Sequence, residues 1–332
     1  MDGEAPAAGR PGPGWKFWLR IGVSLALLAV LVSRAPNPDE LVPDRHHLLT
    51  ATLLTTALLT TLLGVVLSAW RWQRVLHVFD ADIPLRRLVS HYLAGLFVGN
   101  VLPSTIGGDV LRVSRASATV GSGTVAFGSV VLERLTGFVA LPLLVFAGFA
   151  VRPSLLDADR AWIAMVVAGI TLMSLVVILY LAGHPRIAGR FAEHENWMRF
   201  VGAVHLGVDR LRREPRNAIP VIGTAIVYQA SVVAAVALIF RTLDFPVPLA
   251  AVFVYAPAVA MLQVLPLSFN GLGVREGALV LFLHPWGVSN AQAIAAGLLW
   301  FFATLIVSML GAPSFAVGHR NAPKPAPRVP MQ

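Results

Sequence analysis

Residues 124–150 read TVAFGSVVLERLTGFVALPLLVFAGFA, an apolar stretch whose only charges are the adjacent Glu133 and Arg134. About 20 apolar residues in a helix are enough to cross the roughly 30 Å of hydrocarbon in a bilayer. This stretch therefore predicts a transmembrane helix. Because a charge in hydrocarbon costs at least about 2.5–3.5 kcal/mol, its two charged side chains are candidate functional residues.

Five further stretches of similar length and composition predict more spans. They cover residues 15–33, 48–70, 161–182, 218–240 and 291–312. Hydrophobic residues make up 56% of the 332 residues and charged residues only 13%, against about 25% charged residues in soluble domains. The sequence therefore predicts an all-α integral membrane protein with about six transmembrane helices, and it excludes a fold around one soluble core.

The two ends of the chain differ from this membrane domain, which covers residues 15–315. Residues 1–14 are rich in Gly, Pro and Ala and predict a disordered tail, and residues 316–332 predict a second one. Basic residues lead into the first span, as they do in a signal peptide. The long hydrophobic chain that follows favours a retained signal anchor instead.

Two other stretches, residues 88–120 and 249–283, contain apolar segments too short to span a bilayer, each interrupted by Pro and Gly. Broken helices at membrane depth are tolerated where their backbone is buried or lines a wet cavity, so both stretches predict re-entrant helical hairpins. Both interruptions begin with Val-Leu-Pro, and a long span follows each hairpin. This similarity predicts a repeat, with copies at about residues 85–150 and 249–312.

The basic residues predict the orientation of the chain in the membrane. With six spans and a cytoplasmic N-terminus, 19 of the 26 Lys and Arg residues fall on the cytoplasmic side and 5 outside. The positive-inside rule favours this orientation, with both termini in the cytoplasm. Arg71, between Trp70 and Trp72, is counted here as a residue of the interface after the second span. The two hairpins then enter from opposite faces, as in the inverted repeats of alternating-access transporters.

The net charge of +9 is consistent with this topology and with contact to anionic lipids, and we expect no nucleic-acid partner. Within the basic segment of residues 186–216, apolar residues recur at helical spacing. They are Trp197, Val201, Val204, Val208 and Leu211. Such a stripe predicts an amphipathic helix, either in the cytoplasmic interface of the membrane or as a connector packed on the bundle.

Charged residues beside the two interruptions are the expected partners of Glu133 and Arg134. Adjacent positions of a helix point about 100° apart, so these two side chains cannot form an ideal pair with each other. We expect Glu133 to contact Arg112 or Arg275. We expect Arg134 to contact the acidic residue beside one of the two interruptions, which is either Asp109 or Glu276.

These charges have two interpretations, which the sequence leaves open. They are either ion pairs that fix the hairpins, or part of a polar cavity where arginines bind a lipid phosphate. Gly-rich tips could add backbone N–H groups to such an anion site. The candidate lipid-headgroup residues are Asn100, Ser104, Gly107, Gly108, Asp109, Arg112, Glu133, Arg134, Asn270, Gly271, Gly273, Arg275 and Glu276. We find no catalytic motif, no metal-ligand spacing and no cysteine, and we expect no cofactor or metal.

Four motifs carry a resemblance to a known family. They are Trp70-Arg71-Trp72, Asn100-Val101-Leu102-Pro103-Ser104-x-x-Gly107-Gly108-Asp109-x-x-Arg112, Leu132-Glu133-Arg134-x-x-Gly137 and Pro266-x-Ser268-x-x-Gly271-x-Gly273-x-Arg275-Glu276. Together they resemble the lysylphosphatidylglycerol synthase transmembrane-domain (flippase-like) family, from about residue 15 to residue 315. One feature departs from that pattern, because the family usually has an Arg in the span after the second motif and this chain has none near Trp300 and Phe301.

The resemblance implies a multi-pass plasma-membrane protein of a bacterium or archaeon. The best-known members join a soluble aminoacyl-transferase domain, which makes lysyl-phosphatidylglycerol, to a membrane region that moves this lipid to the outer leaflet. This chain ends at Gln332, so we expect a stand-alone membrane member without that domain. The expected function is translocation of a polar or anionic lipid. The alternatives are a membrane-embedded lipid-modifying enzyme and a non-catalytic accessory of a glycosyltransferase or lipid-synthesis enzyme.

Overall fold

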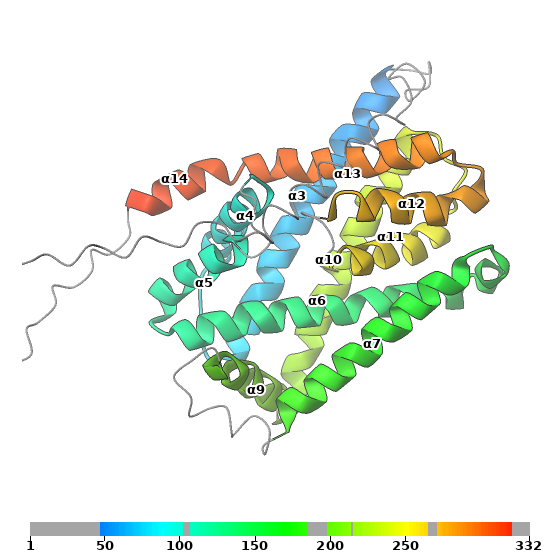
Figure 1. Cartoon of the computed structure of the whole chain (residues 1–332). Coiled ribbons are helices and arrows are strands. Elements are labelled where there is room, and N and C mark those ends of the chain that lie inside the picture. The colour runs from blue at the N-terminus through cyan, green and yellow to red at the C-terminus, as the bar shows by residue number, and fades with distance from the viewer. Residues whose placement is uncertain (1–46, 102–106, 185–197, 214, 265–270, 321–332) are drawn as a thin grey trace, which may run out of the picture.

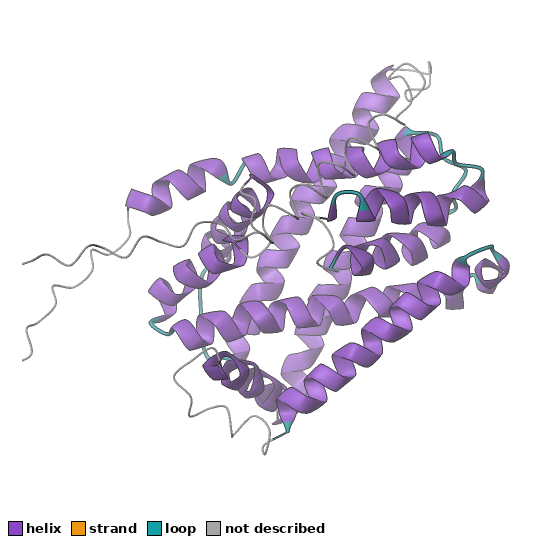
Figure 2. Cartoon of the chain, viewed as in Figure 1, coloured by secondary structure: helices purple, strands orange, loops and turns teal. Residues whose placement is uncertain are grey.

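The computed structural model describes residues 47–101, 107–184, 198–213, 215–264 and 271–320, and this part of the chain contains helices and no strands (Figure 2). Five of its helices are long and apolar enough to cross a membrane. They are α3 (His47–Val78), α6 (Gly123–Val151), α7 (Ala161–Gly183), α10 (Pro215–Thr242) and α13 (Asn290–Met309). The all-α membrane class is thus confirmed, while the expected first span and the N-terminal tail lie outside the described residues.

The beginnings of two spans follow from local capping. The hydroxyl of Ser122 accepts a hydrogen bond from the backbone N–H of Val125 at 3.3 Å, which starts α6. At α13 the caps are reciprocal, because Ser289 accepts from the Gln292 backbone and the Gln292 side chain accepts from the Ser289 backbone. Each bond satisfies an N–H group that has no partner within the first turn of its helix.

Four helices are shorter than the bilayer requires and form two pairs. They are α4 (Leu85–Val101), α5 (Gly107–Val120), α11 (Leu249–Gln263) and α12 (Val274–Leu283). The α5 helix packs on α4 and α6, and α12 packs on α11 and α13. In the view of Figure 1, the first pair lies on the left of the bundle and the second pair on the right. Each pair is therefore followed in the chain by a long helix on which it packs.

The core of the bundle is formed where the long helices meet. The α3 helix packs along α10, and α6 packs against α10 and α11 (Figure 1). The larger apolar cluster includes Tyr255 and Phe282, whose rings stack with centroids 5.0 Å apart. Residues of α7 contribute mainly alanines to this core, and large apolar side chains such as Ile170 and Met173 are exposed on its other side. Such a face suits contact with lipid.

The basic segment forms α9 (Met198–Arg213), which packs on α6 and α7. Val208 is buried in a cluster with Val75 and Leu132, so the apolar stripe contacts the bundle at this position. On the other side, Arg210 donates to the carbonyl of Val78 at 2.9 Å and pairs with Asp80 at 2.5 Å. The described contacts agree with a helix packed on the bundle. Trp197, in the same expected stripe, lies outside the described residues.

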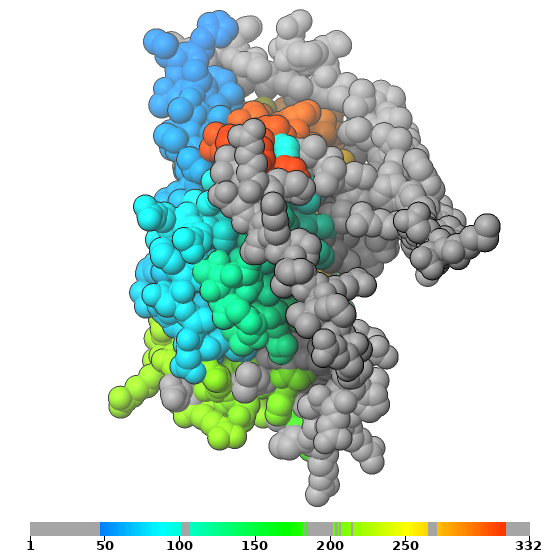
Figure 3. Space-filling model, turned by 90° about the vertical axis from the view of Figure 1, so that its left-hand side faces the viewer, coloured from blue at the N-terminus to red at the C-terminus, as the bar shows by residue number. Residues whose placement is uncertain are grey.

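The last described helix, α14 (Ala312–Arg320), extends beyond residue 315, where we expected the C-terminal tail to begin. It packs on α4, and Figure 3 shows it in red on the face that also carries α4 and α5 in cyan and green. The described part of the chain is therefore helical up to Arg320. Two short 3-10 helices, Pro153–Asp157 and His284–Trp286, complete the described elements.

Candidate functional site

The centre of the bundle holds a buried carboxylate between two arginines from different helices. Glu133 of α6 is 1% exposed. Its Oε1 pairs with Nη2 of Arg71 on α3, and its Oε2 lies 3.1 Å from Nη2 of Arg112 on α5. Both arginines are also buried. Because a carboxylate has two oxygens, it can accept from both guanidinium groups and so join three helices.

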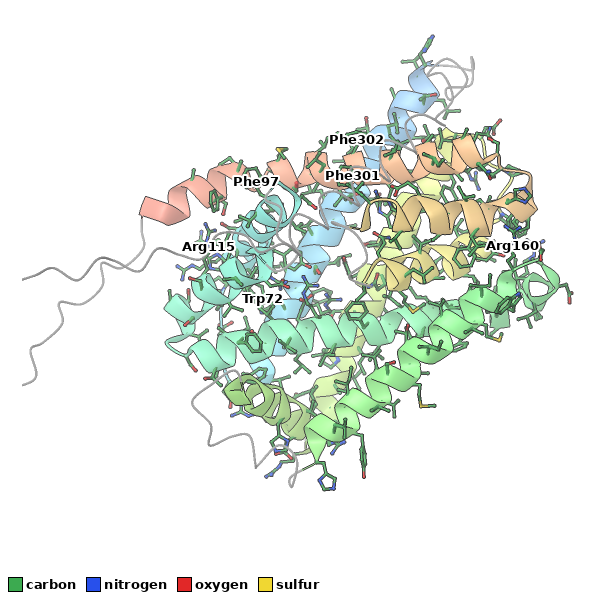
Figure 4. All side chains as sticks on the ribbon, in the orientation of Figure 1. Trp72, Phe97, Arg115, Arg160, Phe301 and Phe302 are labelled. Carbon is green, nitrogen blue, oxygen red and sulfur yellow. The ribbon has the colours of Figure 1, made fainter. Side chains whose placement is uncertain are left out.

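Aromatic rings position the guanidinium group of Arg112. Its central carbon lies 4.3 Å from the ring centroid of Trp72 and 4.3 Å from that of Tyr92, which gives two cation–π contacts. Trp72 in turn donates from its indole N–H to the hydroxyl of Ser129 at 3.0 Å. Figure 4 labels Trp72 in the middle of the bundle, close to α6. The position of Arg112 is thus fixed by rings as well as by its carboxylate partner.

A second ion pair joins α5 to α6 beside the first. Nη2 of Arg134 lies 2.6 Å from Oδ2 of Asp109, and Asp109 is also 3.4 Å from Arg112. The side chain of Arg134 is 52% exposed, whereas that of Asp109 is 21% exposed. The structure therefore shows both contacts expected for the adjacent charges, Glu133 with Arg112 and Arg134 with Asp109.

The charges of the second interruption are arranged differently from our expectation. Arg275 and Glu276 pair with each other at 2.6 Å instead of contacting Glu133 or Arg134. Glu276 also accepts from the backbone N–H of Gly273 at 2.6 Å and so caps α12. Adjacent residues can pair here because the Glu276 side chain turns back to the N-cap at the first turn of the helix, which brings its carboxylate toward Arg275.

The span after the second interruption is α13, and it presents aromatic rings to Arg275 where the resemblance predicted an additional arginine. The guanidinium carbon of Arg275 lies 5.4 Å from the ring centroid of Phe301 and 6.0 Å from that of Trp300. Phe301 is labelled on α13 in Figure 4. The sequence departs from the family pattern at these positions, and the structure shows that they contact the arginine through their rings.

Three glycines leave room for this network. A Cβ at position 137 would lie 2.6 Å from Nη1 of Arg71, and a Cβ at position 297 would lie 2.9 Å from the Glu276 side chain. Gly95 faces Arg112 and Gly108, so a Cβ there would lie 2.9 Å from the Arg112 side chain. These are contacts that only glycine permits without a shift of the charged groups. Gly271 and Gly273 have φ values of +72° and +85°, which also favour glycine.

Two adjoining cavities open beside the ion pairs. The smaller, of about 160 Å³, is lined by the charged side chains Arg71, Arg112, Glu133 and Arg134. The larger, of about 330 Å³, is bounded by α3, α4, α10, α11 and α13 and reaches Arg275. Their shared lining residues are Tyr92, Phe138, Leu141, Tyr228 and Gln229. The cavity beside Glu133 and the cavity that reaches Arg275 therefore share a wall of five residues.

The structure places the remaining candidates as follows. Asn100, at the end of α4, lines the larger cavity. Gly107 begins α5, whose first turn also holds Asp109, where a carboxylate is favoured by the helix dipole. Ser104 and Asn270 lie outside the described residues. Among the residues that are described, no group of three or more His, Asp or Glu side chains could hold a metal ion.

Sequence reasoning missed Arg71 as a member of the site. We expected it in the interface after a span ending at Trp70, but α3 continues to Val78 and Arg71 is 3% exposed. The sequence does indicate a longer helix, because Val75, Leu76 and Val78 continue the helical spacing of apolar residues beyond Trp72. Because Arg71 and Arg112 are buried in the protein, they no longer count among the basic residues of the cytoplasmic side. That side still has more basic residues than the outside.

This arrangement defines a class of protein: a multi-pass helical membrane protein with buried arginine–carboxylate pairs beside an internal cavity. The chain belongs to the family described as the lysylphosphatidylglycerol synthase TM region, which matches residues 17–312. The resemblance of the four motifs is thus confirmed. It is a membrane protein of a family related to lipid metabolism. No curated protein matches the chain.

Proposed function

We propose that this protein moves a polar or anionic lipid between the leaflets of the prokaryotic plasma membrane. The observation that carries the proposal is the pair of adjoining cavities inside the bundle, charged at one end and reaching Arg275 at the other. A lipid headgroup cannot cross hydrocarbon cheaply, because burial of a charge without partners is costly. A path lined by charged and polar side chains lowers that cost.

The short helices support a transport function. A 17-residue α4 and a 10-residue α12 are about 25 Å and 15 Å long at 1.5 Å per residue, less than the roughly 30 Å of hydrocarbon. We take α4–α5 and α11–α12 as re-entrant hairpins of an inverted repeat, each packed on the long helix that follows. In transporters built from such repeats, the substrate site lies near the bilayer midplane, at the interface between the repeats.

The proposed orientation puts both termini in the cytoplasm. It rests on the excess of basic residues on that side, which remains after Arg71 and Arg112 are placed in the interior. In this orientation the connection between α6 and α7 is outside the cell, and the turn between α3 and α4 is inside. The cavities then lie between the two hairpins.

A liposome assay tests the function. The full-length protein is reconstituted with a lipid labelled on its acyl chain, and a membrane-impermeant reductant quenches the label in the outer leaflet only. We expect the wild type to expose the inner-leaflet label to quenching. Thr61→Trp fills the larger cavity and should block this movement, whereas Thr56→Trp, on the exposed side of the same helix, should not.

The same preparation separates the alternatives. Mass spectrometry of the recovered lipid shows whether its headgroup has been changed, which is the result expected of a lipid-modifying enzyme. Lipid that is neither moved nor changed is the result expected of an accessory to another enzyme. Lipid that the wild type does not move, whether its headgroup is changed or not, would overturn the translocation proposal, as would equal activity of Thr61→Trp and the wild type.

A further inference from the structure

We infer that the cavity accepts a lipid phosphate that carries a neutral, hydroxyl-rich headgroup, such as a polyol or sugar, and rejects headgroups that carry an ammonium group. This inference rests on the proposed function, because it names the substrate class of the same site. Such a headgroup differs from the cationic lysyl headgroup in the name of the family. Charge, hydrogen-bonding capacity and the neutral lining each support it.

The charge balance of the cavity favours an anion. Four arginines line the two cavities, and Glu133 is the only acidic residue that does so among the described residues. Counting the partners Asp109 and Glu276 as well, four guanidinium groups face three carboxylates, which leaves one positive charge. A headgroup with a single phosphate charge compensates that excess. An added ammonium group would cancel the phosphate charge and restore the excess.

No carboxylate is left over to bind an ammonium group. Glu133 is shared between Arg71 and Arg112, Asp109 pairs with Arg134, and Glu276 pairs with Arg275 and caps α12. The two stretches that join the short helices, residues 102–106 and 265–270, contain no Asp or Glu. A cationic headgroup that bound through one of these carboxylates would have to break an arginine pair and leave a guanidinium group unpaired, which is costly in a buried site.

Two of the arginines have donors to spare. Nε and Nη1 of Arg71 and Nε of Arg112 are buried, and no described residue accepts a hydrogen bond from them. The side chains of both arginines are at most 5% exposed, and both line the smaller cavity. A buried N–H group without an acceptor costs free energy. Phosphate oxygens supply acceptors of the kind these planar groups bind best.

The larger cavity suits a neutral polar group. Its polar lining apart from Arg275 includes the amides of Gln229, Gln263 and Asn100 and the hydroxyls of Thr60 and Thr304. An amide both donates and accepts, which matches hydroxyl groups that do the same. Aromatic side chains, which can cover the apolar C–H faces of a sugar or polyol, complete the wall; they are Tyr92, Phe138, Tyr228, Trp300 and Phe301. A volume of about 330 Å³ is within the range of about 300–1,000 Å³ usual for small-molecule sites.

A competition experiment on the full-length protein in neutral detergent tests the inference. Equal amounts of phosphatidylinositol, phosphatidic acid, phosphatidylcholine and lysyl-phosphatidylglycerol are offered together, and bound lipid is quantified by native mass spectrometry. We expect phosphatidylinositol to bind most tightly, and about tenfold or more above the two lipids that carry an ammonium group, zwitterionic phosphatidylcholine and cationic lysyl-phosphatidylglycerol, a difference of about 1.4 kcal/mol. Gln263→Met keeps the side-chain length but removes the amide. It should reduce the preference for phosphatidylinositol over phosphatidic acid, while Thr56→Ala, outside the cavity, should not.

Each outcome of the competition experiment either supports or overturns the inference. Equal or tighter binding of either ammonium-bearing lipid overturns the inference, and so does a failure of all four lipids to bind. Equal binding of phosphatidic acid and phosphatidylinositol, unchanged in Gln263→Met, overturns the role of the hydroxyl groups. The expected selectivity without movement in the liposome assay would support this inference and overturn the proposed translocation, so the two failures are distinguishable.

Discussion

Oε2 of Glu133 lies 3.1 Å from Nη2 of Arg112, and this contact joins the middle of α6 to α5. Glu133 is 1% exposed and Arg112 is 4% exposed, so water contributes little to either charge. The other carboxylate oxygen pairs with Arg71 of α3. A single acidic side chain therefore pairs with two buried guanidinium groups and joins three helices.

Removal of that carboxylate should destabilise the protein strongly. Glu133→Ala leaves Arg71 without its carboxylate partner and Arg112 with only the longer contact to Asp109, and an uncompensated buried charge costs about 3–5 kcal/mol. We expect a large decrease in the melting temperature of the detergent-solubilised protein, measured by fluorescence-detected size exclusion after heating. Asp157→Ala, in an exposed turn, is the control and should leave the melting temperature near the wild-type value. A Glu133→Ala variant as stable as this control would contradict the structural importance of the network.

The partners of Glu133 and Arg134 were within reach of sequence reasoning, because each charge in an apolar helix needs an opposite charge at membrane depth. Few charged residues are available as partners, and Asp109 and Arg112 lie near the same interruption, so there were few possible pairings. Arg71 was missed because a Trp-Arg-Trp stretch at the end of an apolar run is also typical of a membrane interface. Only the continuation of α3 to Val78 distinguishes the two positions.

The pairing of Arg275 with Glu276 could not be predicted in the same way. The argument from adjacent helix positions treats the side chains as extended from a regular helix, but these residues lie in the first turn of α12, after the positive-φ Gly273. There Glu276 satisfies a backbone N–H, which brings its carboxylate back toward Arg275. Such capping depends on the path of the chain before the helix, which local periodicity does not specify.

Asp109 and Arg134 should be energetically coupled. Their contact of 2.6 Å joins two helices, although the Arg134 side chain is 52% exposed, so solvent screening limits the coupling to about 1 kcal/mol. A double-mutant cycle with Asp109→Asn and Arg134→Gln measures it from thermal unfolding. The pair Asp209–Arg213, on one helix and more exposed, is the control and should give about 0.3–0.5 kcal/mol. A coupling near zero for the first pair would show that the contact does not hold α5 against α6.

Gly137 should not tolerate even a methyl group. In Gly137→Ala the new Cβ would lie 2.6 Å from Nη1 of Arg71, so the guanidinium group must move from Glu133. We expect a loss of about 1–3 kcal/mol, as for other overpacked sites. In Gly169→Ala, on α7, the Cβ meets nothing within 4 Å. That control should be neutral or stabilised by up to about 1 kcal/mol through helix propensity. Equal melting temperatures of the two variants would contradict the close contact with Arg71.

The proposed orientation predicts labelling from opposite sides of the membrane. The chain contains no cysteine, so a single introduced thiol is the only reactive one. Asp157→Cys and Arg87→Cys replace exposed residues before α7 and in the first turn of α4. We expect a membrane-impermeant maleimide to label the first in intact cells and the second only after permeabilisation. Labelling of both from the same side would overturn the topology.

The C-terminal helix should be held on the first hairpin mainly by Arg115. Its Nη2 donates to the carbonyls of Ser314 and Phe315 at 2.9 and 3.4 Å, and its Nη1 donates to the Ser314 hydroxyl at 3.2 Å. Figure 4 labels Arg115 on α5 beside α14, with Phe97 of α4 nearby. Phe97 and Phe315 add a ring contact, with centroids 5.9 Å apart. Arg115 therefore joins α5 to α14, and the ring contact joins α14 to α4.

Arg115→Ala removes three donors to α14 at once, and each hydrogen bond from a charged group is worth about 1.5–3 kcal/mol. We expect hydrogen exchange of the α14 backbone amides to become about tenfold faster or more, since about 1.4 kcal/mol corresponds to a factor of ten. Exchange in α6 should not change, because Arg115 does not contribute to the Glu133 network. Arg86→Ala, an exposed arginine of α4, is the matched control. If α14 keeps wild-type protection in Arg115→Ala, its contacts with α4, which include a hydrogen bond from the Ser314 hydroxyl to the Ser90 carbonyl at 2.9 Å, are sufficient to hold it, and the arginine does not determine its position.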